Sequence, residues 1–244
     1  MREIEDILLF RGDLSPFLVH LTRSHGGLSA RTRLRRIFDT RRLVPGNSLV
    51  SDARFGGFTN ELDDDEKKRL FSAVCFTETP LSEIHCMLEI ERRRVDLEPY
   101  GLVFLKHRLR RKRVSPVIYI NNEDGRGDEA VQALFELRGN PAASRLLPLV
   151  SVFGLKVWAP GAVARSEGEI DFLWEREWRR PAVLGDLAFN NRDIFCGLCP
   201  HADIDAFEDE YAPLRFIDPT RNMKWYAQAL IDCRQRLDLK HSVV

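Results

Sequence analysis

The sequence predicts an α+β fold with a β-sheet core, flanking helices and a helical C-terminal extension. The chain has 244 residues, enough for one large domain, and its 44% hydrophobic and 30% charged residues are typical of an ordered globular protein. Short apolar runs typical of strands alternate with segments whose apolar residues recur at helical spacing. The sequence has no internal repeat and no low-complexity linker. We therefore expect a core over residues 1–180 and an extension over residues 181–244 packed on it.

Charge and cysteine content indicate a protein of a reducing cytoplasm. The formal net charge is +0, so no overall field attracts nucleic acid or a membrane surface. The five cysteines are too few, and odd in number, for a disulfide framework. The N-terminal segment carries acids where a signal peptide has basic residues, and no run approaches the roughly 20 apolar residues of a membrane span. We expect a cytoplasmic protein with no membrane partner.

Turn, cap and periodicity signals predict the first two elements. Phe17–Thr22 follows a proline and is typical of a strand, whose alternation places His20 and Thr22 on one face. Ser29–Arg42 carries apolar residues at helical spacing, with arginines on its other faces. We expect Ser29 to be the N-cap of this helix.

The same signals predict the remaining elements. Ser48–Asp65 is rich in Gly, Asn, Asp and Ser and predicts a long loop, which inside a compact domain is often functional. The aspartates at its end cap a short expected helix, Glu66–Phe71. Apolar runs bounded by turn residues predict the further strands Ala73–Thr77, Tyr100–Leu105, Pro116–Ile120, Leu149–Trp158 and Asp171–Arg179. Helical periodicity predicts the further helices Leu81–Arg93, Asp128–Arg138, Asp203–Tyr211 and Met223–Arg236.

The most unusual segment is the charged run from Phe172 to Arg180. In a strand, successive side chains point to opposite faces, so Glu175, Glu177 and Arg179 would share one face. Burying two carboxylates and a guanidinium is costly, and a fold does not require it. Carboxylates near apolar walls can have their pKa values pushed apart, which suits acid–base or electrostatic chemistry. The plain alternative is that these charges form the solvated face of a half-exposed sheet.

Five segments, taken in order from about Phe17 to Arg180, resemble the AbiGi-like abortive phage-infection family. They are His20-Leu-Thr22, Cys75-Phe-Thr-Glu-Thr-Pro-Leu81, Tyr100-Gly-Leu-Val-Phe-Leu-Lys106, Pro116-Val-Ile-Tyr-Ile120 and Glu175-Arg-Glu-Trp-Arg179. The pattern also looks like the DarT-like branch of ADP-ribosyltransferases, with Glu175-x-Glu177 as its late-strand Glu-x-Glu motif. The resemblance implies a split β-sheet core that uses NAD as a substrate. It also implies a phage-defence or toxin effector that modifies nucleic acid or protein.

The resemblance further implies roles for individual residues. Glu177 would be the catalytic carboxylate that stabilises the oxocarbenium-like cation formed when the nicotinamide–ribose bond breaks. Glu175 would orient or deprotonate the acceptor nucleophile. The expected contacts to NAD come from His20, Leu21, Thr22, Arg23, Arg54, Phe76, Thr77 and Arg179.

Four of the expected NAD contacts also have a simpler explanation. A lone histidine on a strand, such as His20, is often a core residue, and Phe76 fits a core equally well. Thr77 can cap the helix expected at Leu81, and Arg54 can be a solvated loop residue. The sequence carries no Gly-rich phosphate loop of the Rossmann or Walker type, which disfavours hydride transfer and NTP hydrolysis.

A short cysteine–histidine cluster is a weak zinc signal. Cys196-x-x-Cys199-x-His201 offers three ligands, whereas a structural zinc site usually has four. The missing ligand would have to come from His85, Cys86 or Cys233. The alternative is a turn with two partly buried thiols before a helix. We therefore include no metal ligand among the expected site residues.

Basic residues offer a candidate surface for nucleic acid. A phosphate backbone could bind to the stretch formed by Lys106, Arg108, Arg110, Arg111, Lys112 and Arg113, or to the arginine-rich helix Arg31–Arg42. Such a stretch is also common as a solvated turn region.

Two other functions stay open at this point. AbiGi-like proteins have been described as antitoxins, so the chain could be a non-catalytic protein that binds a cognate toxin or antitoxin. It could instead be a nuclease in which Glu175 and Glu177 hold a metal ion, with Asp52 or Asp171 as a further ligand.

Overall fold

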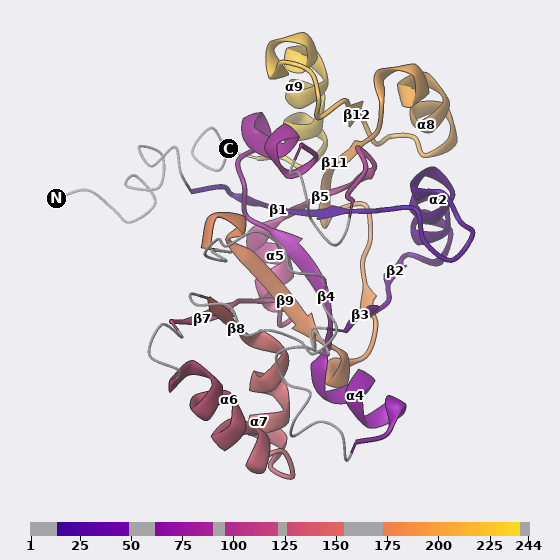
Figure 1. Cartoon of the computed structure of the whole chain (residues 1–244). Helices are drawn as coiled ribbons and strands as arrows, with labels where there is room; N and C mark the ends of the chain where they lie inside the picture. The colour runs from indigo at the N-terminus through magenta and orange to yellow at the C-terminus, as the bar shows by residue number, and fades with distance from the viewer. Residues whose placement is uncertain (1–13, 49–61, 90–95, 122–125, 154–172, 240–244) are drawn as a thin grey trace, which may run out of the picture. The chain divides into compact units, whose positions relative to one another are not determined.

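The computed structural model describes residues 14–48, 62–89, 96–121, 126–153 and 173–239 (Figure 1). These residues form an α+β protein with a mixed eight-stranded sheet, two small two-stranded sheets and seven α-helices, which confirms the predicted α+β class. The chain groups into two compact units. The first contains residues 1–42, 76–112 and 188–244, and the second contains residues 43–75 and 113–187.

The sheet of the first unit is built around a strand that is buried along its whole length. β5 (Gly101–Leu105) pairs antiparallel with β1 (Phe17–Leu21) on one side and with β11 (Ile194–Leu198) on the other. β11 pairs in parallel with β12 (Phe216–Ile217). β1 also pairs antiparallel with the end of β4 (Ser72–Thr77). The strands predicted at the positions of β1, β4 and β5 are confirmed.

One face of this sheet carries the apolar core of the first unit. Phe17 and Val19 of β1 lie in this core with Val103, Leu105 and Phe195. The alternation predicted for β1 is therefore seen in the side chains that face the core. Close packing also explains a glycine: a Cβ at Gly101 would overlap with the carbonyl oxygen of His20 on β1.

Four α-helices accompany this sheet: α2 (Ala30–Thr40), α5 (Lys106–Arg111), α8 (Ile204–Glu210) and α9 (Ala227–Arg236). α2 begins as predicted, because the Ser29 hydroxyl accepts a hydrogen bond from the Thr32 N–H at 3.2 Å. Three 3₁₀ helices complete the unit: η1 (Leu81–Met87), η5 (His201–Asp203) and η6 (Met223–Tyr226).

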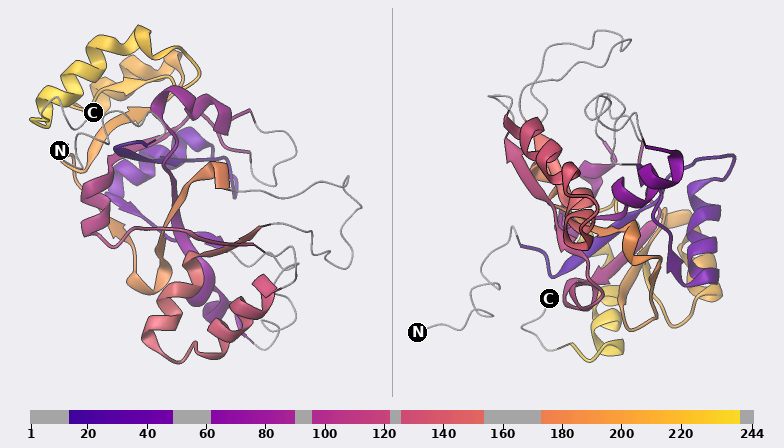
Figure 2. Two further views of the ribbon diagram at one scale, coloured as in Figure 1. Left: turned by 90° about the vertical axis from the view of Figure 1, so that its left-hand side faces the viewer. Right: turned by 90° about the horizontal axis from the view of Figure 1, so that it is seen from below.

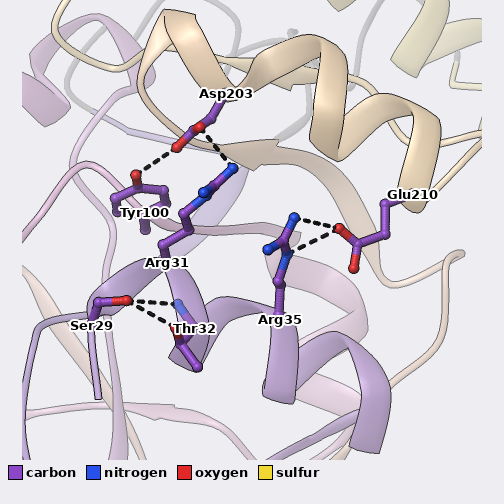
Figure 3. Close-up of polar contacts among 7 residues, drawn as sticks. All are labelled: Ser29, Arg31, Thr32, Arg35, Tyr100, Asp203 and Glu210. Atoms are coloured by element: carbon purple, nitrogen blue, oxygen red, sulfur yellow. Dashed lines mark hydrogen bonds and ion pairs between the residues drawn. The ribbon is translucent and has the colours of Figure 1, made fainter. Parts of the chain in front are cut away.

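Arginines of α2 bind acidic residues at the two ends of α8 (Figure 3). Arg31 lies 3.0 Å from Asp203, whose other oxygen accepts a hydrogen bond from the Tyr100 hydroxyl at 2.6 Å. Arg35 lies 2.8 Å from Glu210, and both side chains are more than a third exposed. Exposed pairs of this kind contribute little to stability, but they hold two of the helix's arginines in place.

The second unit contains the other edge of the sheet. The first part of β4 lies between β3 (Asn47–Ser48) and β9 (Glu177–Pro181), and β9 pairs antiparallel with β6 (Ser115–Pro116). β7 (Ile118–Asn121) and β8 (Val150–Phe153) form a separate parallel pair. A second small sheet pairs β2 (Arg42–Leu43) with β10 (Leu187–Ala188).

Three α-helices belong to the second unit: α4 (Asp64–Phe71), α6 (Arg126–Glu136) and α7 (Pro141–Leu146). α6 contacts α7 and the β7–β8 pair, which lie together in the two further views (Figure 2). Phe71 of α4 and Phe135 of α6 stack in the apolar core of this unit with ring centroids 6.1 Å apart. Three 3₁₀ helices follow: η2 (Leu147–Leu149), η3 (Leu173–Glu175) and η4 (Ala182–Leu184).

Two predicted strands are wrong in part. The strand predicted over Asp171–Arg179 begins only at Glu177, because the chain forms η3 over Leu173–Glu175 and Arg176 then adopts a left-handed φ of 43°. Glu175 and Glu177 therefore do not belong to one strand. The strand predicted over Pro116–Ile120 is divided between β6 and β7, which pair with different partners.

Two further local predictions need correction. The helix expected over Leu81–Arg93 is the 3₁₀ helix η1, which ends at Met87, and residues 90–95 lie outside the described part. The basic stretch expected as a turn forms α5, whose one apolar residue, Leu109, is fully buried. The long loop expected over Ser48–Asp65 lies almost entirely outside the described residues.

The C-terminal part contains strands as well as helices. β11 and β12 belong to the sheet of the first unit, whose last segment starts at residue 188. The expected division into a core over residues 1–180 and an extension over residues 181–244 differs from the two units of the structure, because residues 188–244 belong to the same unit as residues 1–42. In the described part of the chain, no helix has the length and apolar composition needed to cross a bilayer.

Candidate functional site

An ion pair between Glu177 and Arg179 lies on β9. The two residues are separated by one position and therefore project from the same face of the strand. Nη2 of Arg179 lies 2.6 Å from Oε2 of Glu177, and the two side chains are only 7% and 14% exposed. The prediction that these two charges share a face is confirmed, and they are not the solvated face of a half-exposed sheet.

Arg179 is fixed by main-chain acceptors as well. Nη1 of its guanidinium donates to the carbonyl oxygens of Pro148 at 3.0 Å and Val150 at 3.1 Å. Burial lowers the pKa of Arg179, but the charge and hydrogen bond of Glu177 act in the opposite direction, and the net pKa is raised. The guanidinium therefore stays charged and holds the Glu177 carboxylate in one orientation.

Tyr119 and Glu175 complete this polar group, called here the β9 cluster (Tyr119, Glu175, Glu177 and Arg179). The Tyr119 hydroxyl oxygen accepts a hydrogen bond from the Glu177 N–H at 2.8 Å. Burial, together with the negative charges of Glu177 and Glu175, raises the pKa of Tyr119 to about 12. Glu175 is 9% exposed at the end of η3, so the cluster holds two carboxylates in a largely buried environment.

Aromatic packing surrounds the histidine of β1 in the first unit. His20 is half-buried, and its ring centroid lies 5.7 Å from that of Phe76. Phe76 is 3% exposed and also makes an edge contact with Phe104 at 5.8 Å. Phe76 is therefore mainly a core residue, as the simpler explanation anticipated.

The hydroxyls of the threonines expected near NAD are engaged in hydrogen bonds within the protein. The Thr22 hydroxyl lies 3.0 Å from the Tyr100 carbonyl oxygen and 3.3 Å from that of Ala30. The hydroxyl of Thr77 bonds to that of Thr79 at 2.7 Å. A hydroxyl has one proton, so Thr22 can offer a ligand only its acceptor lone pairs while these bonds persist.

The expected site residues thus fall into two groups. Glu175, Glu177 and Arg179 come together in the second unit. The group from β1 and β4 lies in the first unit and comprises His20, Leu21, Thr22, Arg23, Phe76 and Thr77. Arg54 lies outside the described residues.

Sequence reasoning missed two polar partners. Tyr119 sits in a predicted strand, but no spacing rule places its hydroxyl against Glu177. Glu78, buried beside β4, lies 2.8 Å from Lys106 of α5. The sequence offered only one indication of this partner: Glu78 is a charged residue in a segment that is otherwise apolar or rich in hydroxyl groups.

The cysteine–histidine cluster considered for zinc is not assembled. Within the described ranges, no three side chains of His, Cys, Asp or Glu come close enough to hold a metal ion. Cys196 lies within β11 and Cys199 just after it, both fully buried, whereas His201 is exposed on η5. Burial raises the pKa of both thiols, so they remain protonated.

The rate at which each cysteine reacts with a thiol reagent should reflect how deeply that cysteine is buried. A reagent such as DTNB is expected to modify exposed Cys86 rapidly in the native protein, because only an accessible thiolate reacts. Cys196, Cys199 and Cys233 should react only after unfolding, and burial raises the pKa of Cys233 to about 11. Mass spectrometry after timed labelling measures the order. Rapid modification of a buried thiol while Cys86 stays intact would contradict the packing of β11.

The side chains of the basic stretch from Lys106 to Arg113 differ in how available they are to bind a phosphate backbone. Lys106 is engaged with Glu78, and Lys112 lies 3.3 Å from Asp193. Arg110 and Arg111 are exposed at the end of α5. A nucleic-acid role for the whole stretch therefore stays a prediction in which the exposed arginines carry most of the expected contacts.

The β9 cluster has the features of a functional site: two carboxylates, a tyrosine hydroxyl and a buried guanidinium held by main-chain carbonyls. Fixed groups of this kind are suited to stabilising charge in a reacting molecule. Comparisons with protein-family models, with curated proteins and with solved structures each find no match.

Proposed function

We propose that the chain is an NAD-dependent ADP-ribosyltransferase with Glu177 as its catalytic carboxylate. The observation that carries the proposal is the buried Glu177–Arg179 pair on β9, within the Glu175-Arg-Glu-Trp-Arg179 segment. A split-sheet transferase core, a cytoplasmic location and a role in phage defence or as a toxin are parts of the same proposal. They rest on the resemblance of the ordered segments to AbiGi-like and DarT-like proteins.

The chemistry follows from the charge that develops during bond cleavage. The nicotinamide–ribose bond breaks, its electron pair leaves with nicotinamide, and the ribose becomes an oxocarbenium-like cation. A carboxylate oriented by Arg179 stabilises this cation and accepts a hydrogen bond from a ribose hydroxyl. The acceptor's nucleophilic atom then forms a bond with the ribose carbon and loses a proton, which Glu175 can take up as a general base.

Three residues at the end of β1 and just after it have supporting roles in this proposal. His20 would donate a hydrogen bond to a ribose hydroxyl or phosphate of NAD, and Arg23 would pair with its pyrophosphate. Thr22 would serve as an acceptor, because its proton is directed at main-chain carbonyls. These roles stay predictions that single variants can test one by one.

Turnover of NAD by the full chain tests the proposal directly. Purified protein incubated with NAD and cell extract should release free nicotinamide and transfer labelled ADP-ribose to an acceptor in the extract. Nicotinamide release is measured by chromatography, and label transfer by gel and by nuclease or protease digestion of the product. Digestion separates a nucleic-acid acceptor from a protein acceptor.

The outcomes separate transfer, hydrolysis and binding. Nicotinamide release without label transfer would show NAD hydrolysis and would require revising the acceptor part of the proposal. If no nicotinamide is released at high protein concentration, with or without extract, the proposal that the chain is an enzyme acting on NAD is wrong. If the chain then forms a stable complex with a protein from the extract, the result would favour the alternative that it is a non-catalytic protein that binds a cognate toxin or antitoxin.

A further inference from the structure

The end of α2 and the turn before β11 line an open surface cavity of about 510 Å³ in the first unit. It is lined by Arg41, Phe189, Asn190, Asn191 and Arg192. Its volume falls within the roughly 300–1,000 Å³ common for ligand sites. The β9 cluster contributes no side chain to it, so the cavity is independent of the activity proposed for Glu177.

Arg41 is held at the edge of the cavity by three contacts. It is the C-cap of α2 and adopts a left-handed φ of 51°. Its carbonyl oxygen accepts a hydrogen bond from the Phe189 N–H at 3.0 Å, and its guanidinium carbon lies 5.5 Å from the Phe38 ring centroid. Nη1 donates to Oδ1 of Asn191 at 2.8 Å. The guanidinium therefore has a fixed position next to the turn.

The turn that forms the other wall is fixed as well. The Asp193 N–H donates to the Asn190 carbonyl oxygen at 2.9 Å, and the Arg192 N–H donates to Oδ1 of Asn190 at 2.9 Å. Arg236 of α9 donates to the Asn191 carbonyl oxygen at 2.7 Å. These bonds make the wall part of the folded framework.

The polar side chains that line the cavity have donors left to offer a ligand. The amide oxygens of Asn190 and Asn191 already accept bonds from protein N–H groups, so their NH₂ groups, at the opposite end of each amide, are directed elsewhere. Guanidinium groups supply only donors. Asp193, the carboxylate of the turn, accepts from the Asn190 N–H and is neutralised by Lys112 at 3.3 Å.

We propose that this cavity binds a phosphate group, with Arg41 and Arg192 as the charged ligands and the two asparagine amides as neutral donors. A guanidinium matches phosphate geometry, and hydrogen bonds between charged groups are about twice as strong as neutral ones. The phosphate belongs either to a small molecule of nucleotide size or to a nucleic-acid backbone. Both present the same anionic oxygens to the cavity.

Calorimetric titration of the full chain with three probes tests the site: pyrophosphate, ATP and a single-stranded oligonucleotide. Arg192 is exposed, so Arg192→Gln should retain the fold and weaken binding of the preferred probe about tenfold, the loss expected for one charge-assisted hydrogen bond. Arg36→Gln is the matched control, since Arg36 is an exposed arginine of α2 that does not line the cavity.

The three probes separate the two phosphate sources. Binding of pyrophosphate or ATP without the oligonucleotide identifies a small-molecule site, and tighter, strongly salt-dependent binding of the oligonucleotide identifies a nucleic-acid backbone. None of the residues that line the cavity belongs to the β9 cluster, so failure of the proposed activity leaves this result unchanged. The inference is overturned if no probe binds at millimolar concentration, or if Arg192→Gln and Arg36→Gln bind equally well.

Discussion

Replacing Glu177 with glutamine is expected to lower NAD turnover by at least about 100-fold, the usual effect of removing one fixed electrostatic contact to a transition state. The substitution keeps the shape of the side chain and an oxygen that can accept the bond from Arg179. It removes only the negative charge. Because the amide stabilises a developing cation far less well than a carboxylate, the loss should appear in kcat and not mainly in KM.

Nicotinamide release measured over a range of NAD concentrations checks this expectation. Glu210→Gln is the matched control, because Glu210 also pairs with an arginine, Arg35, but is more than a third exposed and outside the β9 cluster. The control should retain full turnover. Circular dichroism and thermal unfolding of both variants establish that the fold is kept. Equal turnover by Glu177→Gln and the unaltered chain would remove Glu177 from the catalytic role.

Much of the sheet could be predicted because its signals are local. β1, β4 and β5 are apolar runs bounded by turn residues, and the caps Ser29 and Asp63 mark the helices that follow them. What sequence patterns cannot supply is the pairing of strands that are far apart in the chain. β11 joins β5 across about ninety residues, and no local period indicates that partner.

The start of β9 shows why the charged segment was only partly predictable. Period-two alternation over Leu173–Arg179 fits a strand, but it does not reveal the left-handed φ of 43° at Arg176, which separates η3 from the strand. The pairing of Glu177 with Arg179 follows directly from their spacing. The Tyr119 hydroxyl and the Pro148 and Val150 carbonyls come from other elements, so their contribution emerges only from the folded chain.

Replacing Arg179 with methionine is expected to cost about 3–5 kcal/mol of unfolding free energy, because it leaves the largely buried Glu177 carboxylate without its cation. It also removes the donor to the Pro148 and Val150 carbonyls. Urea unfolding followed by fluorescence measures the loss. Arg179→Lys keeps the charge but cannot bridge three acceptors with one planar group, so it should retain part of the stability and less of the turnover.

A double-mutant cycle separates the ion pair from packing. If the pair itself is responsible, Arg179→Met should be less destabilising when Glu177 is already glutamine, since no uncompensated charge is then left buried. The coupling should be on the order of 1–3 kcal/mol. Additive losses would mean that Arg179 acts only through the Pro148 and Val150 carbonyls. Arg179 would then be a structural residue of the second unit, and it would not be the residue that positions Glu177.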